Sequence, residues 1–232
     1  MEHLKAVLTR HNITSSAIDK LEAFAPRDGF VVLAEEEFEE LREYLGSFPV
    51  YRCLVPFMTD DNSNYWCLYV DGPLKNMVCY LSHEELDLAP RFRSLSSFLD
   101  TLHQHPHSNG IEDFEDHFFD FPSRQISPKY LLDREIIGAL STAFTAETDE
   151  DQLRTQTAFA IMALTSPTDI ETLLYPFLDD EDPYVQERAI ELLGFHRYQP
   201  AAAKLTALTV SAKPNGRTAA KVALKKITAS RL

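Results

Sequence analysis

A run of four acidic residues, DDED at 179–182, stands between two apolar helical patterns and is followed by Pro183. Carboxylate oxygens suit Ca²⁺, but a calcium loop also needs a sharp glycine turn and a later bidentate acid. This run contains no glycine and leads directly into a helical pattern. We therefore expect no metal site here. The pattern predicts the corner of a helical hairpin, with the acids near the positive N-terminus of the following helix.

Three histidines at alternate positions, His103, His105 and His107, form a second group with metal-binding chemistry. In an extended segment alternate side chains share a face, and three imidazoles there could bind zinc. Pro106 interrupts the group, and no downstream partner follows at the spacing of a zinc site. The pattern favours a polar linker and leaves open whether the three histidines bind a metal.

Nucleophilic and phosphate chemistry lack their usual motifs. The sequence has no GxSxG elbow, and its seven glycines leave little material for a phosphate-binding loop. Cys53, Cys67 and Cys79 lie in apparent strands, where a buried thiol behaves as a small apolar side chain. We expect a protein that is not an enzyme and that has no cofactor.

Aromatic and polar residues gather around an apparent strand, NYWCLYVDG at 64–72. Aromatic side chains that alternate along a strand lie more often half in the core and half on the surface. On the exposed side, Tyr and Trp are strong interface anchors. The predicted partner-binding patch comprises Asp60, Asp61, Asn64, Tyr65, Trp66 and Asp71.

The charges are distributed unevenly along the 232 residues. The chain has 36 acidic and 22 basic residues, a net charge of -14, which disfavours general binding to nucleic acid or to anionic membranes. From Leu192 onward there are eight basic residues and no Asp or Glu. Within this tail Lys213, Arg217, Lys221 and Lys225 recur at helical spacing. They form a candidate basic patch for phosphates or for an acidic protein.

The first half, residues 1–107, combines helical and strand patterns. Apolar residues at helical spacing predict helices over 15–25, 34–48 and 91–105. Three segments rich in Val, Tyr, Trp and Cys predict strands over 50–58, 64–72 and 75–84, joined by turn sequences typical of hairpins. The pattern predicts an α+β domain with an antiparallel sheet flanked by helices.

Roughly residues 15–103 resemble the SUKH superfamily. The resemblance is carried by IDKLEAF, LVPFMTDDNSNYWCLYVDG, VCYLSHEE and SLSSFLDTL, whereas the LP…NGG stretch usual before the sheet is not recognisable. The superfamily includes fungal cell-wall synthesis regulators and bacterial immunity proteins that neutralise toxins. The resemblance implies an immunity role, in which an acidic surface binds and blocks a toxin domain that is often basic because it acts on nucleic acid.

Residues 108–129 mix proline, histidine, acids and phenylalanines without a sustained period, and we interpret them as a linker. The linker separates the SUKH-like domain from a helical domain over 130–232. Its phenylalanines, in FEDHFFDF at 114–121, either bury between the two domains or mark an exposed contact site.

The second half contains an internal repeat. RTQTAFAIMALT from 154, VQERAIELLGFH from 185 and GRTAAKVALKKI from 216 align at a shift of 31, so that Ala158, Ala189 and Ala220 coincide. A period of about thirty residues with paired helices is typical of an α-solenoid. The middle unit resembles a HEAT repeat, in which we expect Gly194 to cap the second helix. Residues 130–232 therefore predict a short HEAT-like solenoid of about three helical hairpins.

These patterns favour a cytoplasmic, acidic, non-enzymatic protein-protein interaction module, most consistent with an immunity protein that neutralises a toxin. One alternative is a nucleic-acid-associated HEAT-repeat protein that uses the basic C-terminal helices. A second is a scaffold subunit of a housekeeping complex. No apolar run approaches the roughly 20 residues of a membrane span, and no signal segment opens the chain. The identity of the partner, the face that binds it and the oligomeric state are left open.

Overall fold

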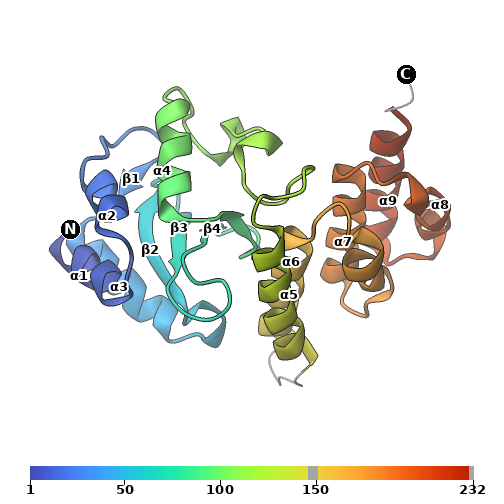
Figure 1. Cartoon of the computed structure of the whole chain (residues 1–232), viewed down its shortest axis with the longest axis horizontal. Coiled ribbons are helices and arrows are strands. Elements are labelled where there is room, and N and C mark those ends of the chain that lie inside the picture. The colour runs from blue at the N-terminus through green and yellow to red at the C-terminus, as the bar shows by residue number, and fades with distance from the viewer. Residues whose placement is uncertain (146–150, 230–232) are drawn as a thin grey trace. The chain divides into compact units, whose positions relative to one another are not determined.

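The computed structural model describes residues 1–145 and 151–229. It divides the chain into two compact units, unit 1 (Met1–Phe121) and unit 2 (Pro122–Leu232). Within the described residues the strands all belong to unit 1, and unit 2 is built of helices and turns (Figure 1). The expected α+β class, an N-terminal antiparallel sheet with helices followed by a helical region, is confirmed.

Unit 1 contains a five-stranded antiparallel sheet whose strands follow one another in sequence order. The strands are β1 (Val31–Val32), β2 (Leu54–Thr59), β3 (Tyr65–Tyr69), β4 (Val78–Leu81) and β5 (Pro90–Phe92). The strands β3 and β4 lie within the segments that the sequence predicts, and β2 overlaps its predicted segment but ends one residue later, at Thr59. The edge strands β1 and β5 were not predicted, since two or three residues are too few to show a period. Residues 49–51 form the 3₁₀ turn η1 (Pro49–Tyr51) before β2 begins.

Unit 1 also contains four α-helices: α1 (Glu2–Arg10), α2 (Ser15–Glu22), α3 (Glu35–Gly46) and α4 (Leu95–Gln104). The helix α4 begins with a capping box, in which the Ser94 side chain accepts from Ser97 N and the Ser97 side chain accepts from Ser94 N. Its apolar face, which includes Phe98 and Leu102, is fully buried. The sequence predicts α2, α3 and α4 but not α1.

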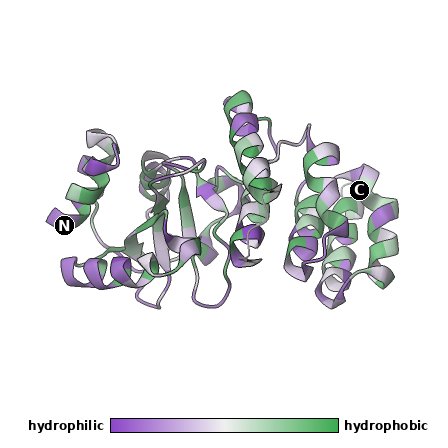
Figure 2. Ribbon diagram, turned by 90° about the horizontal axis from the view of Figure 1, so that it is seen from below, coloured by the Kyte–Doolittle hydropathy of each residue, from purple (hydrophilic) through white to green (hydrophobic). Residues whose placement is uncertain are grey.

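The two faces of the sheet carry separate apolar clusters, because successive side chains on a strand point to opposite faces. Trp66 belongs to the larger cluster and lies with its ring centroid 4.6 Å from that of Phe98 and 5.8 Å from that of Phe92. Cys67 and Cys79, which are paired across β3 and β4, belong to the smaller cluster. Figure 2 shows the strands coloured mainly as hydrophobic, while the helices alternate between the two colours.

The expected linker begins within unit 1. Phe114 and Phe121 are buried, and Phe118 and Phe119 pack against the larger core cluster. The backbone N–H groups of Asp120 and Phe121 also donate to the carbonyl of Arg91, at 2.9 and 3.2 Å. The compact unit therefore ends at Phe121 rather than at residue 107. Burial of large aromatic rings stabilises this segment without any periodic pattern, which is why its sequence has the character of a linker.

Unit 2 forms three consecutive hairpins. Their helices are α5 (Tyr130–Thr145) with α6 (Asp151–Leu164), η4 (Ile170–Leu174) and η5 (Tyr175–Asp179) with α7 (Pro183–Phe195), and α8 (Ala202–Ser211) with α9 (Pro214–Thr228). A 3₁₀ turn, η6 (Gln199–Ala201), precedes α8. The turn expected between α5 and α6 lies at residues 146–150, outside the described residues. In the middle hairpin a π-helical turn and a 3₁₀ turn replace the expected α-helix, since Pro176 lacks the N–H that an α-helix needs.

The repeat register of the sequence corresponds to buried positions. Ala158, Ala189 and Ala220 are each 0% exposed. Gly194 does not cap α7 as expected, because the helix continues to Phe195 and His196 is the C-cap. A Cβ atom on Gly194 would lie only 2.8 Å from the Cα of Ala223 in α9. The glycine therefore permits the close approach of α7 and α9.

Candidate functional site

The predicted partner-binding patch is not one surface. Trp66 is 1% exposed in the aromatic core, so its prediction as an interface anchor is wrong. Asn64 is also buried, and its side-chain oxygen accepts from the backbone N–H of His83 at 2.8 Å. Tyr65 is only partly exposed. Strand alternation alone does not reveal which face is covered, because the aromatic core is assembled from segments far apart in the sequence.

Asp60 organises the turn between β2 and β3. Its carboxylate accepts from the backbone N–H of Asn62 at 2.8 Å, from the Asn64 side chain at 2.8 Å and from the Tyr80 hydroxyl at 3.1 Å. Burial alone would raise the pKa of Asp60, but these hydrogen bonds together lower it below its ordinary value. Asp61 and Asp71 are exposed, and each follows the C-terminal end of its strand, β2 and β3 respectively. Because these strands are antiparallel, their C-terminal ends lie at opposite edges of the sheet. Asp61 precedes β3, so β3 separates the two acids along the chain.

A different part of unit 1 exposes both acidic and aromatic side chains. The helix α3 buries Phe38 and Leu45, and its other face carries four exposed glutamates. At its C-terminal end Tyr44 is 61% exposed and the following Phe48 is 40% exposed. We call this the acidic–aromatic surface, which comprises Glu36, Glu37, Glu40, Glu43, Tyr44 and Phe48.

Its aromatic rings contact one another rather than the core. The Tyr44 and Phe48 ring centroids are 5.2 Å apart, and those of Phe48 and Tyr51 are 5.9 Å apart, both with edge-to-face geometry. Mutual contact holds the exposed rings in place, as an interface anchor requires. Hydrophobic periodicity does not reveal this surface, because it marks only the apolar face of the helix. The available signal was that Tyr44 and Phe48 are four residues apart and do not belong to the apolar face.

The acidic charge of the chain is concentrated in unit 1. Its residues 1–121 include 22 acidic and 9 basic residues, a formal charge of -13, out of -14 for the whole chain. The side chains of Glu35 and Glu39 lie within 3.4 Å of groups on Met1 or His3. The glutamates of the acidic–aromatic surface are exposed beside them. A surface of this kind attracts basic proteins and repels nucleic acid.

The acidic turn of unit 2 contacts neighbouring hairpins. Asp182 caps α7 by accepting from Tyr184 N at 2.8 Å, as expected for a hairpin corner. Arg154 in α6 contacts Asp180, and Lys204 in α8 contacts Asp179 at 2.7 Å. Within residues 1–145 and 151–229, no group of three or more potential ligands (His, Cys, Asp or Glu) could hold a metal ion.

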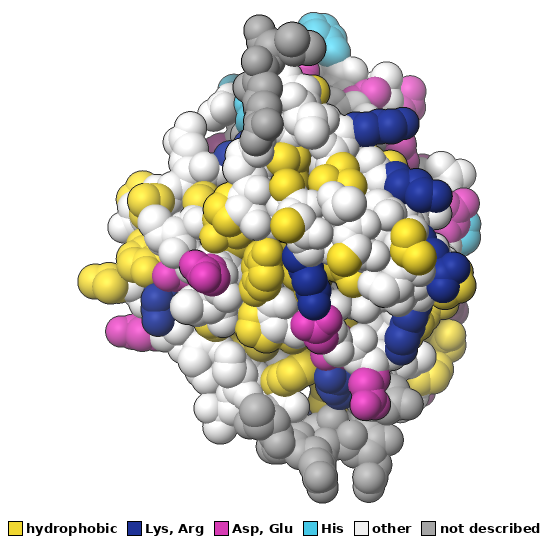
Figure 3. All heavy atoms as spheres, turned by 90° about the vertical axis from the view of Figure 1, so that its right-hand side faces the viewer, with side chains coloured by type: hydrophobic (Ala, Val, Ile, Leu, Met, Phe, Trp, Pro, Cys, Tyr) yellow, Lys and Arg dark blue, Asp and Glu magenta, His cyan; other side chains and the backbone are white. Residues whose placement is uncertain are grey.

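Three residues of the candidate basic patch form a stripe on α9. Arg217, Lys221 and Lys225 are exposed at four-residue intervals, which places them on one helix face. Lys213 is half-buried, and its ammonium group donates to the carbonyl of Glu181. Figure 3 views this end of unit 2, where Lys and Arg side chains follow one side of a face that also carries hydrophobic side chains.

The predicted histidine group is divided by the end of α4. His103 lies in the last turn of the helix, and the ring of His105 stacks on Phe118 with centroids 3.6 Å apart. His107 is exposed in the turn that follows. The segment is therefore not an extended strand, and the three imidazoles have different surroundings.

The cysteines are free and lack an activating environment. Burial raises the pKa of the Cys67 and Cys79 thiols well above the ordinary value, which disfavours the thiolate form that nucleophilic chemistry needs. Burial also raises the pKa of Cys53, although less. Cys67 and Cys79 contribute apolar volume to the smaller core cluster, whereas Cys53 precedes β2 and is partly exposed.

No protein-family model, curated protein or solved structure matches the chain. The resemblances to SUKH domains and HEAT repeats therefore stay predictions. Among the described helices, none is both long and apolar enough to span a bilayer.

Proposed function

We propose that the protein is a cytoplasmic, non-enzymatic binding protein of the immunity type, which captures a basic toxin domain through the acidic–aromatic surface of unit 1. The observation that carries the proposal is the exposure of Tyr44 and Phe48 beside the glutamates of α3. The SUKH-like sequence motifs support the same role.

Each part of this surface has a separate physical role in binding. The glutamates steer a basic partner and accelerate association, because the net charge of unit 1 creates a long-range field. The aromatic rings provide the buried contact area that slows dissociation, since truncation of a hot-spot side chain at the centre of an interface costs about 2 kcal/mol or more. High salt should therefore lower the association rate and have a smaller effect on the dissociation rate.

The test compares two variants of the surface with a charge-matched control. One variant carries Glu36→Gln, Glu40→Gln and Glu43→Gln, and the other carries Tyr44→Ala and Phe48→Ala. The control removes three exposed acids elsewhere in unit 1, with Asp61→Asn, Asp71→Asn and Glu84→Gln. All are used as tagged full-length protein to capture partners from nuclease-treated native lysate.

The proposal expects one basic partner that the native protein and the control recover equally. Each surface variant should bind it at least about tenfold more weakly, a loss of about 1.4 kcal/mol. The partner should be toxic when expressed alone, and co-expression of the native protein should relieve the toxicity. Undiminished binding by both surface variants contradicts the assigned surface, and a partner that is harmless alone favours the scaffold function.

Nucleic-acid binding is a second candidate function, favoured by the exposed stripe of Arg217, Lys221 and Lys225 on α9. It requires affinity for DNA or RNA that falls steeply with salt, because the phosphate contacts release counterions. Lys221→Glu with Lys225→Glu should then abolish binding, whereas the glutamate variant of α3 should leave it intact. The absence of affinity at low salt would end this candidate.

A further inference from the structure

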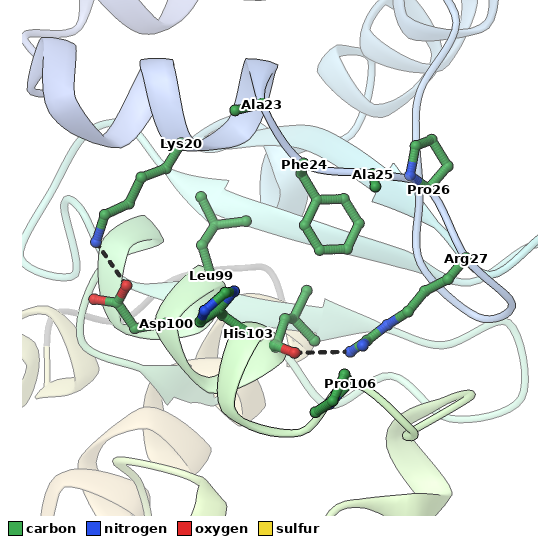
Figure 4. Close-up of a pocket in the computed structure, with 11 residues that line it drawn as sticks. Lys20, Ala23, Phe24, Ala25, Pro26, Arg27, Leu99, Asp100, His103 and Pro106 are labelled. Carbon is green, nitrogen blue, oxygen red and sulfur yellow. Dashed lines mark hydrogen bonds and ion pairs between the residues drawn. The ribbon is translucent and has the colours of Figure 1, made fainter.

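A cavity of about 820 Å³, broadly open to solvent, lies in unit 1 between the end of α2 and the C-terminal half of α4 (Figure 4). Its size falls within the roughly 300–1,000 Å³ of typical small-molecule sites. Phe24, Leu99 and Leu102 provide apolar walls, and Lys20, Arg27 and His103 provide polar groups. None of these side chains belongs to the acidic–aromatic surface, so the inference is independent of the proposed function.

Polar contacts join the two walls of the cavity at both of its ends. At one end Lys20 of α2 pairs with Asp100 of α4 at 2.6 Å. At the other end Arg27 donates from Nη2 to the carbonyl oxygens of Leu102 and His105, at 3.1 and 3.0 Å. Between these contacts the α2 side contributes Phe24 and two alanines, Ala23 and Ala25, whose methyl groups cannot fill the space (Figure 4).

The charge of the lining is opposite to that of the unit around it. Asp100 is the single acid among the lining residues, and Lys20 already pairs with it. The Arg27 guanidinium is hydrogen-bonded to neutral carbonyls, so its positive charge has no ionic partner in these contacts. Burial lowers the pKa of Arg27, and its Nε is buried without a hydrogen-bond partner. A nearby anion would stabilise this partly desolvated cation.

His103 adds a hydrogen-bonding group to the lining of the cavity. It projects from the last turn of α4 and lies beside Leu99 and Asp100 (Figure 4). Its imidazole can donate a hydrogen bond to an oxygen atom of a bound ligand. The apolar surface of Phe24 and Leu99 is continuous with these polar groups, which suits a ligand with one charged end.

We propose that this cavity binds a small molecule with an apolar body and a single carboxylate. The carboxylate lies near Arg27 and His103, and the body covers Phe24 and Leu99. The ion pair of Lys20 with Asp100 closes the apolar end. Arg27 is an element of this site as well as a contact to the end of α4, so its replacement would disturb both.

The probes are 3-phenylpropionate and its amide, which share the apolar body and differ in the charge of the head group. Binding to the full chain is measured by calorimetry and by the NMR chemical shifts of backbone amides. We expect saturable binding of the acid, with shifts concentrated at residues 20–27 and 99–106. The acid should bind at least about tenfold more tightly than the amide, since a charge-assisted hydrogen bond is replaced by a neutral one.

Two substitutions locate the site without removing Arg27. Ala25→Leu narrows the cavity and leaves its charges in place, and His103→Gln removes the imidazole from an exposed helix end. Both should weaken binding of the acid by about fivefold or more, whereas His107→Gln, outside the cavity lining, should leave it unchanged. No saturable binding at millimolar acid, equal affinity for the acid and the amide, or full binding by Ala25→Leu would each overturn the proposal.

Discussion

Arg154 and Asp180 form a bidentate ion pair that joins the first helical hairpin of unit 2 to the second. Arg154 in α6 donates from Nη1 to Asp180 Oδ1 at 3.2 Å and from Nη2 to Oδ2 at 2.7 Å. The Asp180 side chain is only 8% exposed and also accepts from the backbone N–H of Asp182 at 2.9 Å. The pair therefore positions the acidic turn from which α7 begins.

Replacing Arg154 with alanine should destabilise unit 2 by about 2 kcal/mol, because the carboxylate of Asp180 would stay buried without its cation. The measurement is urea unfolding followed by far-UV circular dichroism, which reports mainly the helices. Trp66 is the one tryptophan of the chain and lies in unit 1, so its fluorescence follows the other unit separately. Lys204→Ala breaks a more exposed pair in the same turn and should cost less than about 1 kcal/mol. Equal losses for the two variants would contradict the structural role of Arg154.

Two glycine substitutions should have opposite effects on unit 2. A Cβ atom at Gly194 would lie 2.8 Å from the Ala223 backbone, so Gly194→Ala should force α7 and α9 apart and cost about 1–3 kcal/mol. At Gly138, in α5, no atom lies within 4 Å of an added Cβ. Gly138→Ala should stabilise the protein by about 0.5–1 kcal/mol through helix propensity. Thermal unfolding compares them, and a neutral Gly194→Ala would show that the helices do not require this close contact.

Unit 2 should lose stability between about pH 6.5 and pH 4 because of His196. Burial, and then the positive charge of Arg124, lower the pKa of His196 from 6.5 to about 4 in the folded chain. As the pH falls, the unfolded chain binds the proton before the folded chain does. The contribution of neutral His196 to the free energy of unfolding is therefore complete above pH 6.5 and is lost by about pH 4. The shift corresponds to at most about 3 kcal/mol.

The check is urea unfolding of the native protein and of His196→Gln at several pH values across this window. The unfolding free energy of the native protein relative to His196→Gln should decrease as the pH is lowered from 6.5 to 4, since the glutamine does not titrate. His107→Gln, at an exposed histidine, should retain the native pH dependence. A constant difference between native protein and His196→Gln would mean that His196 does not resist protonation.

Phe119→Ala should destabilise unit 1 alone. The Phe119 ring lies 5.5 Å from that of Phe92 and 5.6 Å from that of Phe114, so its loss should cost about 1–3 kcal/mol. Trp66 fluorescence should report the loss while the helical transition of unit 2 stays unchanged. Phe48→Ala removes an exposed phenylalanine and should cost about 0.5 kcal/mol or less. An equal loss in unit 2 would instead indicate that Phe119 buries between the two units.

The elements that are long enough to repeat a hydrophobic period could be predicted from the sequence. The helices α2, α3 and α4 and the strands β2, β3 and β4 follow their hydrophobic spacing, and the repeat of Ala158, Ala189 and Ala220 corresponds to three buried positions. These patterns are local, since each depends on residues within one or two turns or strands. The short strands β1 and β5 contain too few residues for such a pattern.

The candidate sites depended on contacts that no local pattern contains. The side chain of Trp66 has the same alternating context whether it is exposed or buried, and only the packing of Phe30, Phe98 and Phe114 against it decides that it lies in the core. The cavity beside Arg27 likewise lies between two segments that are about 75 residues apart in the sequence, as Arg27 and Leu102 are.

The sequence by itself determined the α+β class, the helical repeat and the excess of acidic charge, because these follow from residue types and their spacing. The tertiary structure decided that Asn64 and Trp66 are buried, that Tyr44 and Phe48 are exposed, and that Gly194 serves packing rather than capping. The physical reason is that exposure and close approach are properties of pairs of elements. They are decided only when segments distant in the sequence pack against one another.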